Sequence, residues 1–146
     1  MAGVKQISVF LENKSGRLAE VTRRLAEAGI NLGALSIADT SDFGILRFIC
    51  DQPDKAAEVL RGAGFSVGET DVLAVQVPHR PGGLADVVAA IKPLNANIEY
   101  LYAFVGRSGQ DAFVVLRLEG GREQEVGEAL QKAGYRLLAP EEAYAL

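Results

Sequence analysis

Two short glycine-containing loops are the parts of this 146-residue sequence with the clearest chemical potential. They read Glu12-Asn-Lys-Ser-Gly-Arg-Leu18 and Pro78-His-Arg-Pro-Gly-Gly-Leu84, and each joins an alternating apolar segment to a helical one. A helix start presents unpartnered backbone N–H groups at its positive end, where a carboxylate binds without a dedicated cation. Asn13 and His79 hold equivalent positions, from which their side chains could hydrogen-bond an amino group. Spacing alone also fits plain turns, in which glycine serves only to reverse the chain.

The composition excludes several other kinds of chemistry. One His and one Cys are too few for a zinc site or an internal disulfide, and the net charge of −4 disfavours nucleic-acid binding. His79 has no acid or nucleophile in sequence reach, so we expect no catalytic residue, no metal and no cofactor, and we interpret Cys50 as a small core residue. Without an export signal or a long apolar run, the sequence predicts a cytoplasmic protein with no membrane partner.

The sequence contains an internal repeat, which gives the domain organisation. A shift of 66 residues superposes segment 7–38 on 73–104, and after four extra residues near 107–110 the shift becomes 70. Glycines and helix-face leucines keep their order, as in Gly16 with Gly82 and Leu60 with Leu130. We therefore predict two domains of about 70 residues, 1–70 and 71–146, which would be marginal alone and should pack on each other or on another chain.

Each repeat is predicted to run strand, helix, strand, strand, helix, strand. The alternating and helical spacings place these elements in the first copy at 7–11, 18–28, 30–38, 43–50, 53–63 and 65–67. In the second copy they fall at 73–77, 84–94, 98–105, 112–118, 123–133 and 135–138. Ser15 is the expected N-cap of the first helix, and Pro93 should bend or shorten the corresponding helix of the second copy.

This order predicts an α+β fold of two ferredoxin-like units, each with a four-stranded antiparallel sheet and both helices on one face. Leu35, Ile37, Leu101 and Ala103 should face the helices. The opposite face of the second copy carries Tyr100, Tyr102 and Phe104, with Arg117 beside them. Such a stripe favours packing of this face on another sheet, while ligand contact and base stacking, as in RNA-recognition modules, are alternatives.

Both copies resemble the ACT domain, whose usual phrase runs from a polar and a basic residue through Pro-Gly-x-Leu into a helix that ends before Gly-Ile-Asn. Val9 to Thr22 with Ala28-Gly-Ile-Asn-Leu32 carries the resemblance in the first copy, and Val75 to Leu84 with Asn95-Ala-Asn-Ile98 carries it in the second. Pro81-Gly82 keeps the Pro-Gly pair, whereas Ser15 replaces the proline in the first copy. The resemblance covers essentially the whole chain.

The resemblance implies a regulatory module that binds a small ligand, mostly an amino acid. Such domains usually pair side by side into eight-stranded sheets and hold ligands between the glycine loop and the second strand of a partner domain. It therefore implies a homodimer or higher oligomer, and a regulated enzyme acting in trans. The implied ligand-binding residues are Asn13, Lys14, Ser15, Gly16, Arg17, Leu18, Ser36, Ile37, His79, Arg80, Pro81, Gly82, Gly83, Leu84, Tyr100, Leu101 and Tyr102.

Two other functions remain open at this level. The chain could be a purely structural dimerisation module with both loops as plain turns. It could also be an acylphosphatase-like hydrolase on the same fold, with Arg17 holding a phosphate and Asn13 positioning water, although the loop lacks a longer glycine-rich cradle. Tyr100, Tyr102 and Phe104 suggest a pocket for a ligand with a bulky or aromatic side chain, and the same residues would equally serve an interface.

Overall fold

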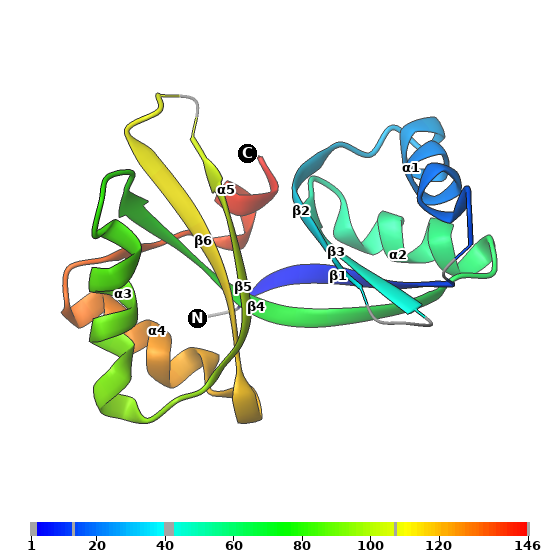
Figure 1. Ribbon diagram of the computed structural model, residues 1–146. Coiled ribbons are helices and arrows are strands. Elements are labelled where there is room, and N and C mark those ends of the chain that lie inside the picture. Colours follow the sequence, from blue (N-terminus) through cyan, green and yellow to red (C-terminus); the bar gives the residue numbers. More distant parts are fainter. Residues whose placement is uncertain (1–2, 13, 40–42, 107, 146) are drawn as a thin grey trace. The chain divides into compact units, whose positions relative to one another are not determined.

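A computed structural model describes residues 3–12, 14–39, 43–106 and 108–145, which form two compact units (Figure 1). The N-terminal unit comprises Lys5–Thr70 and Ala143–Leu146. The C-terminal unit comprises Met1–Val4 and Asp71–Glu142. Each unit thus takes a short segment from the far end of the chain in addition to its own repeat.

The N-terminal unit has two helices on one face of an antiparallel sheet (Figure 1). Its elements are β1 (Val4–Glu12), α1 (Arg17–Glu27), β2 (Leu32–Asp39), β3 (Phe43–Cys50), α2 (Pro53–Gly62) and the beginning of β4 (Ser66–Pro78). The strand order is β2-β3-β1-β4, with β3 antiparallel to both β1 and β2. This is the ferredoxin-like order, and β2 forms its free edge.

The C-terminal unit repeats this arrangement with the later part of β4 as its first strand. It continues through α3 (Gly83–Ile91), the 3₁₀ turn η1 (Lys92–Leu94), β5 (Ile98–Val105), β6 (Asp111–Leu118), the 3₁₀ turn η2 (Glu119–Gly121), α4 (Glu123–Lys132) and β7 (Arg136–Leu137). The last helix, α5 (Pro140–Tyr144), begins in this unit and ends in the N-terminal unit. The order β7-β4-β6-β5 makes β5 the edge strand. The predicted α+β class with two ferredoxin-like units is confirmed.

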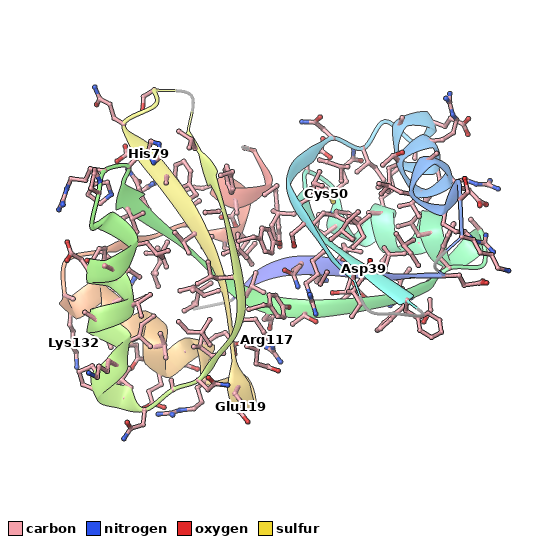
Figure 2. All side chains as sticks on the ribbon, in the orientation of Figure 1. Asp39, Cys50, His79, Arg117, Glu119 and Lys132 are labelled. Carbon is pink, nitrogen blue, oxygen red and sulfur yellow. The ribbon has the colours of Figure 1, made fainter. Side chains whose placement is uncertain are left out.

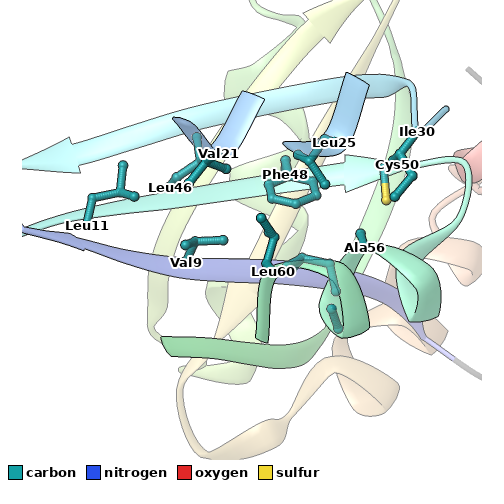
Figure 3. Close-up of a cluster of buried hydrophobic side chains, with 12 residues drawn as sticks. Val9, Leu11, Val21, Leu25, Ile30, Leu46, Phe48, Cys50, Ala56 and Leu60 are labelled. Carbon is teal, nitrogen blue, oxygen red and sulfur yellow. The ribbon is translucent and has the colours of Figure 1, made fainter. Parts of the chain in front are cut away.

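Each unit has its own apolar core between the sheet and its helices. In the N-terminal unit Val9, Leu46 and Phe48 from the sheet meet Leu25 of α1 and Leu60 of α2 (Figure 3). The C-terminal core is built from the matching positions of the second repeat: Val75, Leu116 and Leu118 with Ile91 and Leu130. Because the apolar residues have the same spacing in both repeats, the two cores are packed from equivalent positions.

Cys50 lies in the N-terminal core with 1% of its surface exposed, as the sequence predicts. Burial raises the pKa of its thiol from 9.0 to about 11, because a thiolate loses its hydration there. The thiol is therefore a neutral packing group at physiological pH rather than a nucleophile.

Helix starts and ends agree with the sequence except at one cap. Pro93 falls in η1, which shortens α3 to Ile91, and Asn95 adopts the left-handed φ of 51° that ends this segment. Ser15 was the expected N-cap of α1, and this prediction is wrong. Gly16 occupies the cap position with a φ of 88°, and no side chain caps the helix. A serine N-cap normally has an extended backbone, whereas the residue at the cap position here, Gly16, is left-handed.

Two features of the chain differ from the sequence-based elements. The predicted strands 65–67 and 73–77 are parts of the single strand β4, which runs through the polar segment Gly68-Glu-Thr-Asp71. The strand persists because β1 neighbours it first and β6 later, and ladder hydrogen bonds do not depend on side-chain polarity. Helix α5 was not predicted, since five residues are too few for a helical period. Residues 40–42, between the predicted strands 30–38 and 43–50, lie outside the described residues.

Candidate functional site

The two glycine loops have nearly the same backbone. Gly16 and Gly82 have φ angles of 88° and 86°, and each occupies the N-cap position of the following helix without any side-chain cap. The next residue turns back, since Arg17 N donates to Lys14 O and Gly83 N donates to Arg80 O. The following amides, at Leu18 and Leu84, start a helix and have no intrahelical acceptor. Each loop therefore presents helix amides without a side-chain cap at a positive helix end.

Charged side chains hold the N-terminal loop. Glu12 lies 2.9 Å from Lys14 and 3.2 Å from Arg17, and Arg17 also lies 3.2 Å from Glu20. The hydrogen bond from Lys14 holds the pKa of Glu12 below its usual value, with a smaller contribution from the charge of Arg17. Ser15 is exposed beside them, and Asn13 lies outside the described residues. Arg17 is thus shared between two carboxylates rather than presented to an anion.

The C-terminal loop is held mainly by its backbone. His79 N donates to Gln110 O at 2.8 Å, so the longer hairpin tip of the second repeat supports the loop. A side chain at Gly83 would place Cβ 2.3 Å from Pro78 O, so this position requires glycine. Arg80 reaches Asp86 at 3.5 Å and the carbonyl of Pro81, while the His79 side chain is exposed at the end of β4 (Figure 2).

The predicted strand residues do not meet the loop of their own unit. Tyr102 lies in the row of Val115 and Ala74, four residues or about 13 Å along β4 from Pro78. Tyr100 pairs with Arg117, which Figure 2 shows at the opposite end of the sheet from His79. Leu101 faces the helix side, in the row of Leu116. A site that combines loop and strand therefore needs a strand from another domain.

The same separation holds in the N-terminal unit. Ile37 lies in the row of Leu46 and Val9, three residues or about 10 Å from Glu12, and Ser36 lies opposite Arg47 on the other face. The repeat thus reproduces both the loop and its distance from the edge strand.

The edge strand and the first helix of each unit both carry exposed apolar side chains. We call them the edge strips: Leu18, Leu35 and Ile37 in the N-terminal unit, and Leu84, Val88, Leu101 and Val105 in the C-terminal unit. Leu35 is 52% exposed although it pairs with the buried Phe48, so it faces the helices as predicted and still remains uncovered. The alternating sequence pattern predicts which face of the sheet these side chains occupy. Their exposure follows only from the position of β2 and β5 at the sheet edges.

The aromatic stripe of β5 lies on the face opposite the helices, as predicted. Phe104 stacks on Phe113 with ring centroids 5.3 Å apart, while Phe113 and Val115 are 9% and 1% exposed. Tyr100 and Tyr102 are half-buried. This burial favours a packing role over base stacking, for which open aromatic faces are required.

Two other features, a metal-binding cluster and a membrane-spanning helix, are absent from the part of the chain that the structure describes. No group of three or more His, Cys, Asp or Glu side chains that could hold a metal ion occurs in 3–12, 14–39, 43–106 or 108–145. Within the same residues, no helix has the length and apolar character needed to cross a membrane.

Comparison with known proteins agrees with the tandem architecture. The family described as "ACT domain pair" matches residues 2–137. Protein BT0572 from Bacteroides thetaiotaomicron is 43% identical in sequence, with a TM-score of 0.92 over 99% of this chain and 98% of that one. No curated protein matches the sequence.

The regulatory subunit of aspartate kinase from Thermus thermophilus, in its ligand-free form, shares the fold at 20% identity. Its TM-score is 0.66 over 90% of this chain and 93% of that one. The corresponding subunit from Thermus flavus has 19% identity and a TM-score of 0.62 over 92% and 94% of the two chains. Because the family match spans nearly the whole sequence, the chain belongs to the ACT domain pair family.

Proposed function

We propose that this protein is an amino-acid-binding regulatory protein or regulatory subunit, with ligand held at one or both glycine loops. The observation that carries the proposal is the pair of glycine caps: Gly16 and Gly82 leave the first amides of α1 and α3 without a side-chain cap. A ligand carboxylate supplies the acceptor that these amides lack, and the helix dipole favours its charge. The regulatory-subunit relatives share this fold, which is consistent with a regulatory role.

The other half of the proposed site comes from a second copy of the chain. The edge strips leave seven large apolar side chains exposed beside the unpaired edges of β2 and β5. Pairing two edges buries such side chains and completes the sheet hydrogen bonds. It would also bring Ser36 and Ile37, or Tyr100, Leu101 and Tyr102, toward a loop of the partner. Ligand binding would thereby be coupled to the association of chains.

Regulation would follow from preferential binding to one state of the assembly. A ligand shifts an equilibrium only by its difference in affinity between two states. A site shared by two copies has that difference, since it is complete only when the edges are paired. The chain would transmit this change to an enzyme in trans and would need no catalytic group itself.

Hydrolysis of an acyl phosphate is less consistent with the loop. The Arg17 guanidinium contacts both Glu12 and Glu20, whose charges oppose the approach of a phosphate. A purely structural dimerisation module would keep the edge strips and lack ligand affinity.

Calorimetric titration with each of the twenty amino acids tests the proposal. We expect at least one to bind with a dissociation constant in the millimolar range or below, and sedimentation velocity to show a ligand-dependent change in association. Failure of all twenty at millimolar concentration would reject ligand sensing and leave the dimerisation module. Sedimentation of a Leu101→Glu variant then shows separately whether the edge of β5 mediates association.

A further inference from the structure

The C-terminal unit contains a cavity of about 350 Å³, and no residue of its glycine loop lines it. It lies between the middle of β4, α4 and the end of β7, with Leu73, Leu137 and Leu138 forming its apolar part. Gly127 lies on the α4 wall. A Cβ there would come within 3.1 Å of Leu137 Cδ1 and 3.3 Å of Leu73 Cδ2, so the glycine brings α4 against the leucines.

The polar part of the cavity is acidic. Asp71 and Glu128 contribute carboxylates, and Gln124 and Gln131 contribute amides. Among the described residues, none of these four side chains forms an ion pair or a side-chain hydrogen bond.

Glu123 adds a carboxylate that is already neutralised. It is about nine-tenths buried and lines the cavity, while its Oε1 accepts hydrogen bonds from Arg117 Nη1 at 2.7 Å and from Leu118 N at 3.1 Å. Arg117 Nη1 also donates to Asp71 O at 3.1 Å. The arginine thus compensates Glu123 and contacts the Asp71 backbone, while the carboxylates of Asp71 and Glu128 have no ion-pair partner within 3–12, 14–39, 43–106 and 108–145.

The N-terminal unit fills the corresponding place with ion pairs. Lys5 Nζ lies 2.7 Å from Asp54 Oδ1 and 3.5 Å from Glu69 Oε1, and Arg61 Nη1 lies 3.4 Å from Glu69 Oε2. By the repeat alignment, the counterparts of Lys5, Asp54, Arg61 and Glu69 are Asp71, Gln124, Gln131 and Ala139. The second repeat therefore has no counterpart of these two cations, and the described lining of the cavity carries more acidic than basic side chains.

We propose that this cavity binds a small organic cation with a short apolar stem, such as an alkyl amine or diamine. An ammonium group would donate to the Asp71 and Glu128 carboxylates and to the glutamine side-chain oxygens, while its methylene groups would lie on the leucines. An organic cation fits better than a metal ion, since the described residues contain no metal-ligating cluster. The inference goes beyond the amino-acid site and does not depend on it.

Titration of the full chain with 1,4-diaminobutane tests this inference, with 1,4-butanediol as the uncharged compound of matched length. Calorimetry and amide chemical shifts should detect the diamine and not the diol. The shifts should centre on α4 and β7 rather than on the loops at Gly16 and Gly82. We expect a dissociation constant below about 10 mM. Absence of binding at a diamine concentration of about 10 mM would overturn the proposal.

Matched single variants separate the cavity from general attraction to an acidic protein. Glu128→Gln should lower diamine affinity about two- to fivefold, as expected for one partly exposed ion pair. Glu58→Gln removes the same charge from the counterpart position of the N-terminal unit and should leave the affinity unchanged. Equal losses in both variants would attribute binding to net charge and reject the cavity.

A double variant that copies the first repeat gives the strongest test. Asp71→Lys with Gln124→Asp introduces the Lys5–Asp54 pair at the cavity and should reduce diamine affinity at least about tenfold, because the new ammonium competes for the same carboxylates. Circular dichroism verifies folding. If the double variant does not fold, the comparison of Glu128→Gln with Glu58→Gln still tests whether the diamine binds at the cavity. Retained affinity in a folded double variant would contradict the proposal.

Discussion

The two repeats hold the same glycine loop in different ways. In the N-terminal unit the loop is surrounded by a chain of ion pairs, from Lys14 through Glu12 and Arg17 to Glu20. In the C-terminal unit a backbone hydrogen bond from His79 to Gln110 and the close approach of Pro78 O to Gly83 fix the loop. Among the described residues, the N-terminal loop thus carries the larger network of surface ion pairs, and the C-terminal loop has the closer backbone contact.

This difference indicates how the two loops respond to conditions and to substitution. Exposed ion pairs contribute little to stability and are screened by salt, so the N-terminal loop should tolerate change and respond to ionic strength. Close backbone packing depends on shape rather than on charge. The conformation of the C-terminal loop should therefore be insensitive to salt, and a larger side chain at Gly83 should disrupt it. We therefore expect the C-terminal loop to be the better organised ligand site.

The largest effect should come from Gly83→Ala. The new Cβ would lie 2.3 Å from Pro78 O, so the loop must shift, and we expect a loss of about 3 kcal/mol in the free energy of unfolding. The counterpart, Arg17→Ala, should cost less than about 1 kcal/mol. Urea denaturation followed by circular dichroism suits a chain without tryptophan. Similar losses in the two variants would remove the proposed contrast between the loops.

Glu123→Ala should have the next largest effect. The carboxylate is buried and accepts from Arg117 and from Leu118 N, so its loss leaves both donors without this acceptor and should destabilise the protein by about 2 kcal/mol. The repeat places Pro53 at the same position, where Pro53→Ala should cost less than about 1 kcal/mol. The same denaturation curves measure both, and a neutral Glu123→Ala would show that the pair is dispensable.

Gly82→Val should act mainly on ligand binding. The left-handed φ of 86° strains valine by about 1–2 kcal/mol, while the nearest atom to the new Cβ is Arg80 Nη1 at 3.8 Å. The loop should relax, move the α3 amides and lower amino-acid affinity about tenfold in calorimetry. Gly16→Val makes the same change in the N-terminal loop. Unchanged affinity in Gly82→Val, with a loss in Gly16→Val, would assign the site to the N-terminal loop.

Glu12→Gln should give the smallest effect and the clearest salt dependence. Removal of this carboxylate frees Lys14 and leaves Arg17 with Glu20 alone, so carboxylate binding at the N-terminal loop should strengthen about twofold at low salt and lose this gain at high salt. Asp86→Asn, beside Arg80, is the matched change in the C-terminal loop. Titrations at two salt concentrations measure both variants, and weaker binding in Glu12→Gln would contradict this expectation.

The pH dependence of the same loop follows from the direction of the Glu12 pKa. Lys14 lowers this pKa below its ordinary value of 4.5, so Glu12 stays ionised, and its pairs persist, from pH 8 to pH 5. They are lost only as the pH falls through the lowered value. The ionisation of Glu12 should therefore cause no change in the amino-acid affinity of this loop between pH 8 and pH 5, which calorimetric titration of the wild-type protein measures.

Much of the fold could be predicted because the repeat doubles the information in each pattern. Leu25 and Leu60 show the helical period, Val9 and Phe48 show the alternating one, and all four are buried where expected. Local rules also found the break at Pro93. The Ser15 cap was missed because a backbone angle, rather than a side-chain type, decides which residue caps α1.

The candidate loops could be found from sequence, while their surroundings could not. Glycine, turn residues and a helix start are adjacent in the chain, so their spacing indicates an anion-binding turn. Gln110 supports His79 across 31 positions, and the cavity joins β4 with α4 across more than 50. No local pattern encodes such pairs.

The sequence by itself determined the duplication, the order of elements in each unit, the position of both glycine loops and which face of each strand meets the helices. These properties depend on neighbours along the chain, whose period fixes where side chains point. The tertiary structure alone decided that β4 serves both units, that Leu35 and Leu101 stay exposed at sheet edges, and that one repeat is closed by ion pairs where the other leaves an acidic cavity. Strand neighbours and charge compensation arise between residues far apart in sequence, and only the folded chain brings them together.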